Sequence, residues 1–99
     1  MLDIEKATKE LGEKTLEEIE AMTAKTWGAR AVASYRLAKK ARTPADGFRR
    51  FYEGENFRQE AFEHAAMVDD GGELLREVRG QVKGPREESI KYVEGLVST

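Results

Sequence analysis

Apolar residues recur every third or fourth position along the whole chain, and no run alternates apolar and polar residues as a strand does. This spacing predicts helices and no sheet. A short first helix is expected from Asp3 to Leu11, ending at Gly12, because glycine readily takes the positive φ found at helix C-termini. Thr15 and Glu18 form a capping box, in which each side chain can bond the backbone amide of the other, and a long helix follows to about Ala41.

A second long helix is expected after a short connection. Thr43 can cap it, and Pro44 suits its first position because an N–H there would have no helical partner. The connection is only a few residues long, so the two long helices are predicted to lie antiparallel. The second helix is expected to run to about Asp70.

Two glycine-containing pairs divide the rest of the chain. Gly71-Gly72 is expected to end or kink the second helix, and a third segment continues from Glu73 to Val82. Gly84-Pro85 is expected to open a last short helix, "REESIKYVEGLV". We therefore interpret residues 1–99 as a single all-α domain, an antiparallel helical hairpin with short flanking helices.

The two long helices carry more apolar surface than short flanking helices can cover. One side of the first helix alternates large rings with alanines, in the set Glu20, Ala24, Trp27, Ala31, Tyr35 and Ala38. The second helix is apolar on two sides, with Phe48, Phe51, Phe62 and Ala65 on one and Phe57, Ala61 and Val68 nearly opposite. Such a helix is typical of a bundle centre or a subunit contact. We expect a homodimer or larger oligomer in which two hairpins complete a four-helix bundle.

Charge and composition narrow the range of partners. The 17 Lys and Arg residues nearly balance the 19 Asp and Glu residues, so no overall field recruits nucleic acid or a membrane, and neither is expected as a partner. The absence of cysteine excludes disulfides and thiolate metal sites. The first residues lack the apolar stretch of a signal peptide and no later run could span a bilayer, so the expected location is the cytoplasm.

Two neighbouring segments resemble a known helix pair. The segments "SYRLAKKAR" (residues 34–42) and "FRRFYEGENFRQEAFEHAAM" (residues 48–67) are similar to the first helix pair of ferritin-like, rubrerythrin-type proteins. The resemblance implies a helical bundle in which iron is held by a glutamate of the first helix and a Glu-x-x-His pair of the second. Here the residue three positions before His64 is Ala61, so that pair is not matched.

The resemblance covers about residues 15–68, and a second registration of that stretch places Glu20 and Glu55 at the family's separation. Arg58 then stands in the position of the histidine, so the ligand set is again incomplete. If the resemblance reflects a common fold, the usual diiron site has been lost or rearranged in this chain.

A rearranged metal site can be predicted from the residues around His64, the only histidine of the chain. Glu60 lies one helical turn before His64 and Glu53 about two turns before Glu60, and Fe or Mn accepts a carboxylate-rich shell with one imidazole. One chain supplies few ligands, but a two-fold interface would double the set. The alternative is that His64 makes an ordinary structural hydrogen bond or lies in solvent.

A different chemistry can be built on Arg58 and His64. The segment "RQEAFEH" has an Arg-x5-His form that resembles the ribonuclease motif of HEPN domains, in which motifs from two subunits form the active site. His64 would then transfer a proton and Arg58 would stabilise phosphate charge. Six positions on a regular helix separate the two side chains by about 120°, so a partner chain would have to bring them together. Whether the protein is an enzyme is left open.

Two charged groups complete the candidates. A basic cluster surrounds the predicted turn between the long helices, made of Arg36, Lys39, Lys40, Arg42, Arg49 and Arg50. It could grip a phosphate backbone, but such a cluster at a helix C-terminus is typical of solvated surface. Glu55 and Arg58 are expected to pair across one turn and fix the packing register. The expected function is therefore self-association, in an assembly or partner-binding role, with Fe or Mn as the candidate metal.

Overall fold

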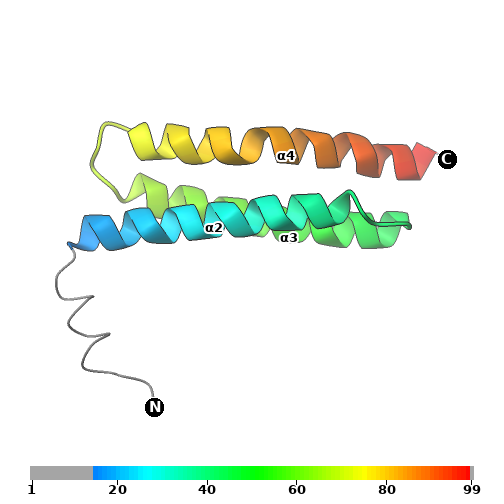
Figure 1. Cartoon of the computed structure of the whole chain (residues 1–99), viewed down its shortest axis with the longest axis horizontal. Helices are drawn as coiled ribbons and strands as arrows, with labels where there is room; N and C mark the ends of the chain where they lie inside the picture. Colours follow the sequence, from blue (N-terminus) through cyan, green and yellow to red (C-terminus); the bar gives the residue numbers. More distant parts are fainter. Residues whose placement is uncertain (1–14, 99) are drawn as a thin grey trace, which may run out of the picture.

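The computed structural model describes residues 15–98, which form three long helices (Figure 1). They are α2 (Leu16–Ala38), α3 (Pro44–Ala66) and α4 (Glu73–Ser98). No strand occurs in this part of the chain, which confirms the predicted all-α class. The helix expected from Asp3 to Leu11 lies outside the described residues. None of the three helices is long and apolar enough to cross a membrane.

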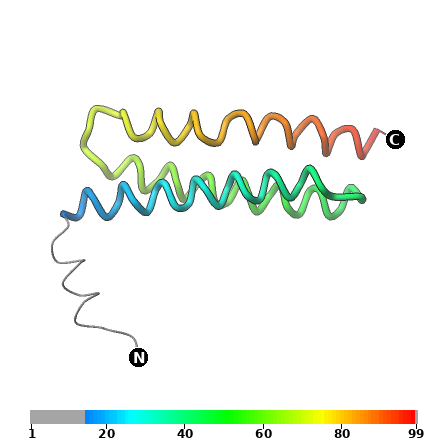
Figure 2. Tube along the Cα trace, in the orientation of Figure 1, coloured from blue at the N-terminus to red at the C-terminus, as the bar shows by residue number. Residues whose placement is uncertain are grey.

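The helices form one bundle in which each packs against the other two. The chain runs along α2, returns along α3 and runs back along α4, so α2 and α4 point in the same direction (Figures 1 and 2). The connections between them are short, residues 39–43 and 67–72. Successive helices are therefore antiparallel neighbours, as short connections require.

Threonine caps begin α2 and α3 where the sequence predicts them. The Thr15 hydroxyl accepts from the backbone N–H of Glu18 at 3.1 Å. The Thr43 hydroxyl accepts from the N–H of Asp46 at 3.2 Å, and Pro44 occupies the first turn. Each cap gives a partner to a backbone amide that has none inside the helix. The end of α2 is Ala38, three residues before the predicted Ala41.

The break between α3 and α4 falls at the predicted glycines. Gly71 and Gly72 have φ values of 73° and 84°, which glycine adopts without strain. The Asp70 carboxylate accepts from the backbone N–H of Gly72 at 3.1 Å and of Leu74 at 3.0 Å, and so caps the start of α4. Helix α3 ends at Ala66, before the predicted Asp70.

The predicted division of the C-terminal segment at Gly84-Pro85 is wrong. Helix α4 runs through both residues without interruption and, with 26 residues, is the longest of the three, not a pair of short flanking helices. Proline lacks an N–H, so the carbonyl of Gln81 loses its helical partner. Proline also clashes with the side chain of the residue before it, and Gly84 has no side chain to clash. The pair is therefore tolerated inside the helix.

The core is built mainly from small side chains. The buried apolar residues are Ala24, Ala31, Tyr35, Ala38, Ala41, Ala61, Ala65, Leu74, Val78, Val82 and Val93. Several larger apolar side chains are exposed instead, namely Leu16, Met22, Leu37, Phe48, Tyr52, Met67 and Val97. Alanines allow close helix packing, but they bury little apolar surface per residue.

Candidate functional site

His64 lies between two carboxylates at the contact of α3 with α2. Its Nδ1 is in hydrogen-bonding contact with Glu20 of α2, and its Nε2 lies 3.9 Å from the Glu60 carboxylate one turn earlier on α3. An ionised carboxylate only accepts hydrogen bonds, so Nδ1 is the donor to Glu20. In the neutral imidazole, the lone pair is then on Nε2, on the side of Glu60. Metal-binding histidines are commonly oriented in this way, by a carboxylate that accepts from the nitrogen that does not bind the metal, here Glu20.

The exposure of these groups suits a site at the surface. The side chains of His64 and Glu20 are 27% and 26% exposed, and that of Glu60 is 48% exposed. The cluster is therefore partly desolvated by its own chain and open on one side. A charged ligand or a second protein surface could approach Nε2 and Glu60 from that side.

The structure separates Glu53 from the other two predicted metal ligands. Eleven residues along α3 place Glu53 about 16 Å from His64. The Glu53 carboxylate instead lies 3.2 Å from the Arg50 guanidinium. Within residues 15–98, no three His, Cys, Asp or Glu side chains converge on one ion position. In one chain, the donors around His64 are therefore too few to enclose a metal.

Glu20, and not the predicted Glu53, is the second carboxylate beside His64. The sequence placed Glu20 on the packing side of the first helix but did not connect it with His64. A usable signal was present, because Glu20 stands 21 residues before Ala41 in the connection and His64 stands 23 residues after it. Positions at nearly the same distance from a short connection lie near each other in an antiparallel helix pair.

Two aromatic rings lie beside this cluster. Trp27 of α2 and Phe57 of α3 stack with their centroids 5.6 Å apart, and the Arg30 guanidinium lies 4.9 Å from the Trp27 ring. Trp27 and Phe57 are each two helical turns from Glu20 and His64 respectively, and both rings are only partly buried. We use the name α2/α3 face for the surface formed by Glu20, Trp27, Phe57, Glu60 and His64.

A second polar group ties all three helices together. Glu55 of α3 accepts from the Tyr35 hydroxyl of α2 at 2.6 Å and from Arg86 of α4 at 2.7 and 3.3 Å. Burial by itself raises the pKa of Glu55, but the hydrogen bonds from Arg86 and Tyr35 outweigh it and hold the pKa below its usual value. The expected Glu55–Arg58 ion pair is wrong, because Arg86 takes that place.

Arg58 and His64 face different neighbours within one chain. The Arg58 guanidinium lies 4.6 Å from the ring of Phe62, on the side of α3 that borders α4. His64 contacts Glu20 of α2. The two side chains that a ribonuclease site would need together are thus directed apart, in agreement with the 120° separation expected from their spacing.

The basic cluster near the first connection is partly neutralised. Lys39 pairs with Glu88 at 3.1 Å, Arg49 with Asp46 at 2.7 Å and Arg50 with Glu53 at 3.2 Å. Half of the six predicted cations therefore already have carboxylate partners. Exposed pairs of this kind contribute little to stability, but they weaken the field that a phosphate backbone would meet.

Comparison with known proteins adds no relative. The chain matches no protein-family model, no curated protein and no solved structure. The functional proposal therefore rests on the geometry of the α2/α3 face.

Proposed function

We propose that this protein is a self-associating, ferritin-like helical protein that binds Fe or Mn between two copies of its α2/α3 face. The observation that carries the proposal is the position of His64, whose ring lies between the carboxylates of Glu20 and Glu60 on a partly exposed surface. The proposed role is assembly around a metal ion.

The donor set supports a two-copy site. One chain offers the Glu60 carboxylate and the Nε2 atom of His64, with Glu20 orienting the imidazole through Nδ1, and a two-fold axis through the α2/α3 face would offer two carboxylates and two imidazoles. Fe and Mn accept such mixed oxygen and nitrogen ligands. In ferritin-like dimetal proteins, two helices of a four-helix bundle each give a glutamate, and the other two each give a Glu-x-x-His motif. This chain differs in having Glu60 four residues before His64.

The distribution of apolar residues supports self-association. Tyr35, Val78 and Val82 are the largest fully buried apolar side chains of residues 15–98, whereas other large residues such as Met22 and Tyr52 are exposed. The stacked rings on the α2/α3 face are also only partly buried. A second copy on the α2/α3 face would remove the exposed parts of these two rings from water. The formal net charge of −2 opposes pairing only weakly.

The proposal can be tested by measuring mass and metal together. The tag-free protein is loaded with Fe(II) or Mn(II) without oxygen, passed over a sizing column with light scattering, and analysed for bound metal. We expect a dimer or larger assembly with at least one ion per two chains. His64→Ala and Glu20→Gln should lower the bound metal at least tenfold while circular dichroism stays unchanged.

Glu63→Gln provides the matched control. Glu63 is adjacent to His64 in sequence but bonds Gln59 at 3.3 Å instead of approaching the imidazole, so its loss should leave the metal content unchanged. A metal-free wild-type protein, or equal losses in the His64 and Glu63 variants, would refute the metal site. A monomeric wild-type protein would refute self-association.

A further inference from the structure

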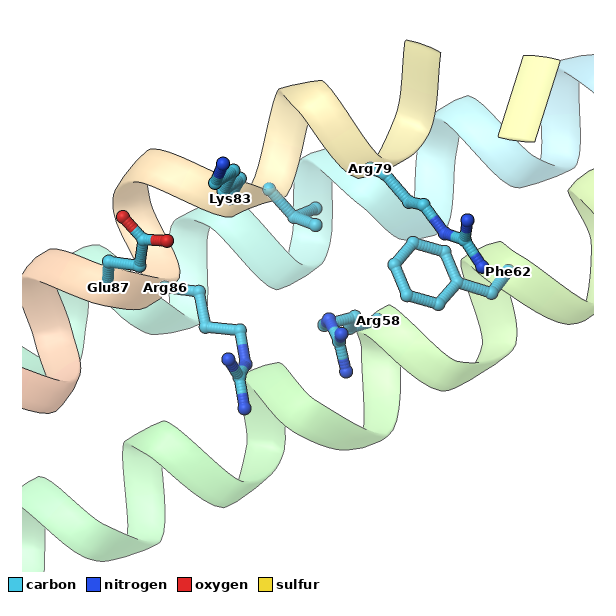
Figure 3. A pocket seen from close by; sticks show the side chains of 7 residues that line it. Arg58, Phe62, Arg79, Lys83, Arg86 and Glu87 are labelled. Atoms are coloured by element: carbon cyan, nitrogen blue, oxygen red, sulfur yellow. The ribbon is translucent and has the colours of Figure 1, made fainter. Parts of the chain in front are cut away.

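We infer that a groove between α3 and α4, separate from the α2/α3 face, binds the phosphate of a small organic phosphomonoester of nucleoside monophosphate size. The groove has a volume of about 200 Å³. Figure 3 shows the labelled side chains around it, Arg58 and Phe62 from α3 and Arg79, Lys83, Arg86 and Glu87 from α4.

The charge of the groove is mainly positive. Four cationic side chains and one carboxylate, Glu87, line it. Arg86 is already committed to Glu55 through two hydrogen bonds. Arg58, Arg79 and Lys83 have no ion pair with any residue of the described part of the chain. Glu55 is near enough to Arg58 for this cation to help lower the pKa of Glu55, but no carboxylate is in ion-pair contact with the three cations, and their shared positive charge favours an anion in the groove.

Phe62 places two of these cations. Its ring centroid lies 4.6 Å from the Arg58 guanidinium carbon and 5.7 Å from that of Arg79, and Figure 3 shows Arg79 reaching from α4 across the ring. The ring attracts both guanidinium groups, which would otherwise repel each other. Their positions are therefore set before any ligand binds, which reduces the entropy lost on binding.

The types of donor favour phosphate. A guanidinium presents paired N–H donors that match two oxygens of one phosphate, and Lys83 adds a compact charge. The dianion of a phosphomonoester balances the charge of these groups better than a single carboxylate does. Arg86 is held in place by two hydrogen bonds to Glu55, so its main contribution to the groove is its positive charge.

A second hollow of about 540 Å³ continues from the groove and can hold the rest of the ligand. It shares Arg58, Phe62 and Arg79 with the groove and adds the amides of Asn56 and Gln59. Apolar contact comes from Ala66 and Leu75, and Glu55 and Glu63 also border the hollow. Amides and apolar groups suit an uncharged organic group with hydrogen-bonding edges, whereas the carboxylates disfavour further phosphates. This selects a monophosphate over a polyphosphate.

The test is a titration of the full chain with AMP at low ionic strength, followed by isothermal calorimetry or amide NMR shifts. Wild-type protein should bind AMP more tightly than ATP, inorganic phosphate or sulfate. Arg58→Gln and Lys83→Gln should each weaken AMP binding about tenfold, because each removes a charge-assisted hydrogen bond. Arg58→Lys keeps the charge but loses the paired N–H donors of the guanidinium. Its affinity for AMP should lie between those of wild type and Arg58→Gln.

Lys91→Gln is the matched control, since it makes the same charge change on α4 at an exposed position outside the groove. It should change AMP affinity less than twofold. The inference is overturned if wild type binds none of these probes, if sulfate binds as well as AMP, or if Lys91→Gln costs as much as Lys83→Gln. Preference for a single-stranded oligonucleotide over AMP would also overturn it. None of these outcomes depends on metal binding or on self-association.

Discussion

Tyr35 is the only aromatic residue of the described chain that is fully buried, and its hydroxyl determines how the three helices are joined. A buried phenol needs a hydrogen-bond partner, and Glu55 provides it at 2.6 Å. The partly buried Glu55 carboxylate in turn needs an opposite charge to offset its desolvation, and Arg86 of α4 supplies it. One buried hydroxyl thus accounts for a polar link that joins α2, α3 and α4.

This link predicts a loss of stability in alkali. Burial, with a smaller contribution from Glu55, raises the pKa of Tyr35 above its ordinary value of about 10. Above about pH 10 the unfolded chain loses the phenolic proton while the folded chain keeps it, so the free energy of unfolding falls as pH rises. Tyr35→Phe should reduce this slope in urea unfolding between about pH 9 and 11, at a pH-independent cost of about 1 kcal/mol for the lost hydrogen bond.

Tyr52→Phe is the control for the alkaline experiment. Tyr52 is 59% exposed, so its hydroxyl lacks the burial that acts on Tyr35. Its substitution should leave the slope as in wild type. Equal slopes in wild type and Tyr35→Phe would show that the Tyr35 phenol does not control alkaline stability.

Close helix approach is the main feature at the level of the elements. Gly54 of α3 lies against the ring of Tyr35, so that an added Cβ would come within 2.6 Å of a ring carbon. Gly28 of α2 similarly faces the side chain of Gln81 of α4. Together with the buried alanines, these glycines let the helices pack with few large side chains between them.

Alanine substitutions should distinguish glycines that are needed for close packing from glycines that have open space around them. Gly54→Ala should lower the free energy of unfolding by about 1–3 kcal/mol, because the Tyr35 ring is held by Glu55 and cannot easily move away. Gly80→Ala on α4 is the matched control. Nothing lies within 4 Å of its added Cβ, so it should raise the free energy of unfolding by about 0.5–1 kcal/mol. Denaturant unfolding measures both, and the same sign for both variants would contradict this assignment.

Local features of the sequence predicted the elements better than the contacts between them. Thr15, Thr43 and the Gly71-Gly72 pair mark boundaries through interactions with their own neighbours, and the structure has all three boundaries. The break at Gly84-Pro85 was wrong, because packing of α4 on two helices outweighs one lost hydrogen bond. The Glu20–His64 and Glu55–Arg86 pairs depend on how helices are placed in space, so the spacing of residues along one helix could not show them.

At the scale of the whole molecule, α3 presents different chemistry on its two sides. Toward α2 it presents Glu60 and His64, and toward α4 it presents Arg58 and Phe62 beside the cationic groove. A second copy on the α2/α3 face would leave that groove open. The proposed metal site and the inferred phosphate site can therefore be occupied at the same time, and substitutions in one should not alter the other.

Self-association through the α2/α3 face predicts that a bulky cation there prevents assembly. Thr23 lies three residues after Glu20 and four before Trp27, so it shares their side of α2, and its hydroxyl bonds only back to the Ile19 carbonyl at 2.8 Å. Thr23→Arg should convert an assembly of at least about twice the 11.2 kDa chain mass into a monomer by light scattering, with unchanged helix content. Arginine favours helices more than threonine does, so the fold should survive. Gln59→Arg adds the same charge to α3 beside the groove and should leave the mass unchanged. Assembly that survives Thr23→Arg, or that is lost equally in both variants, would mean that another surface joins the copies.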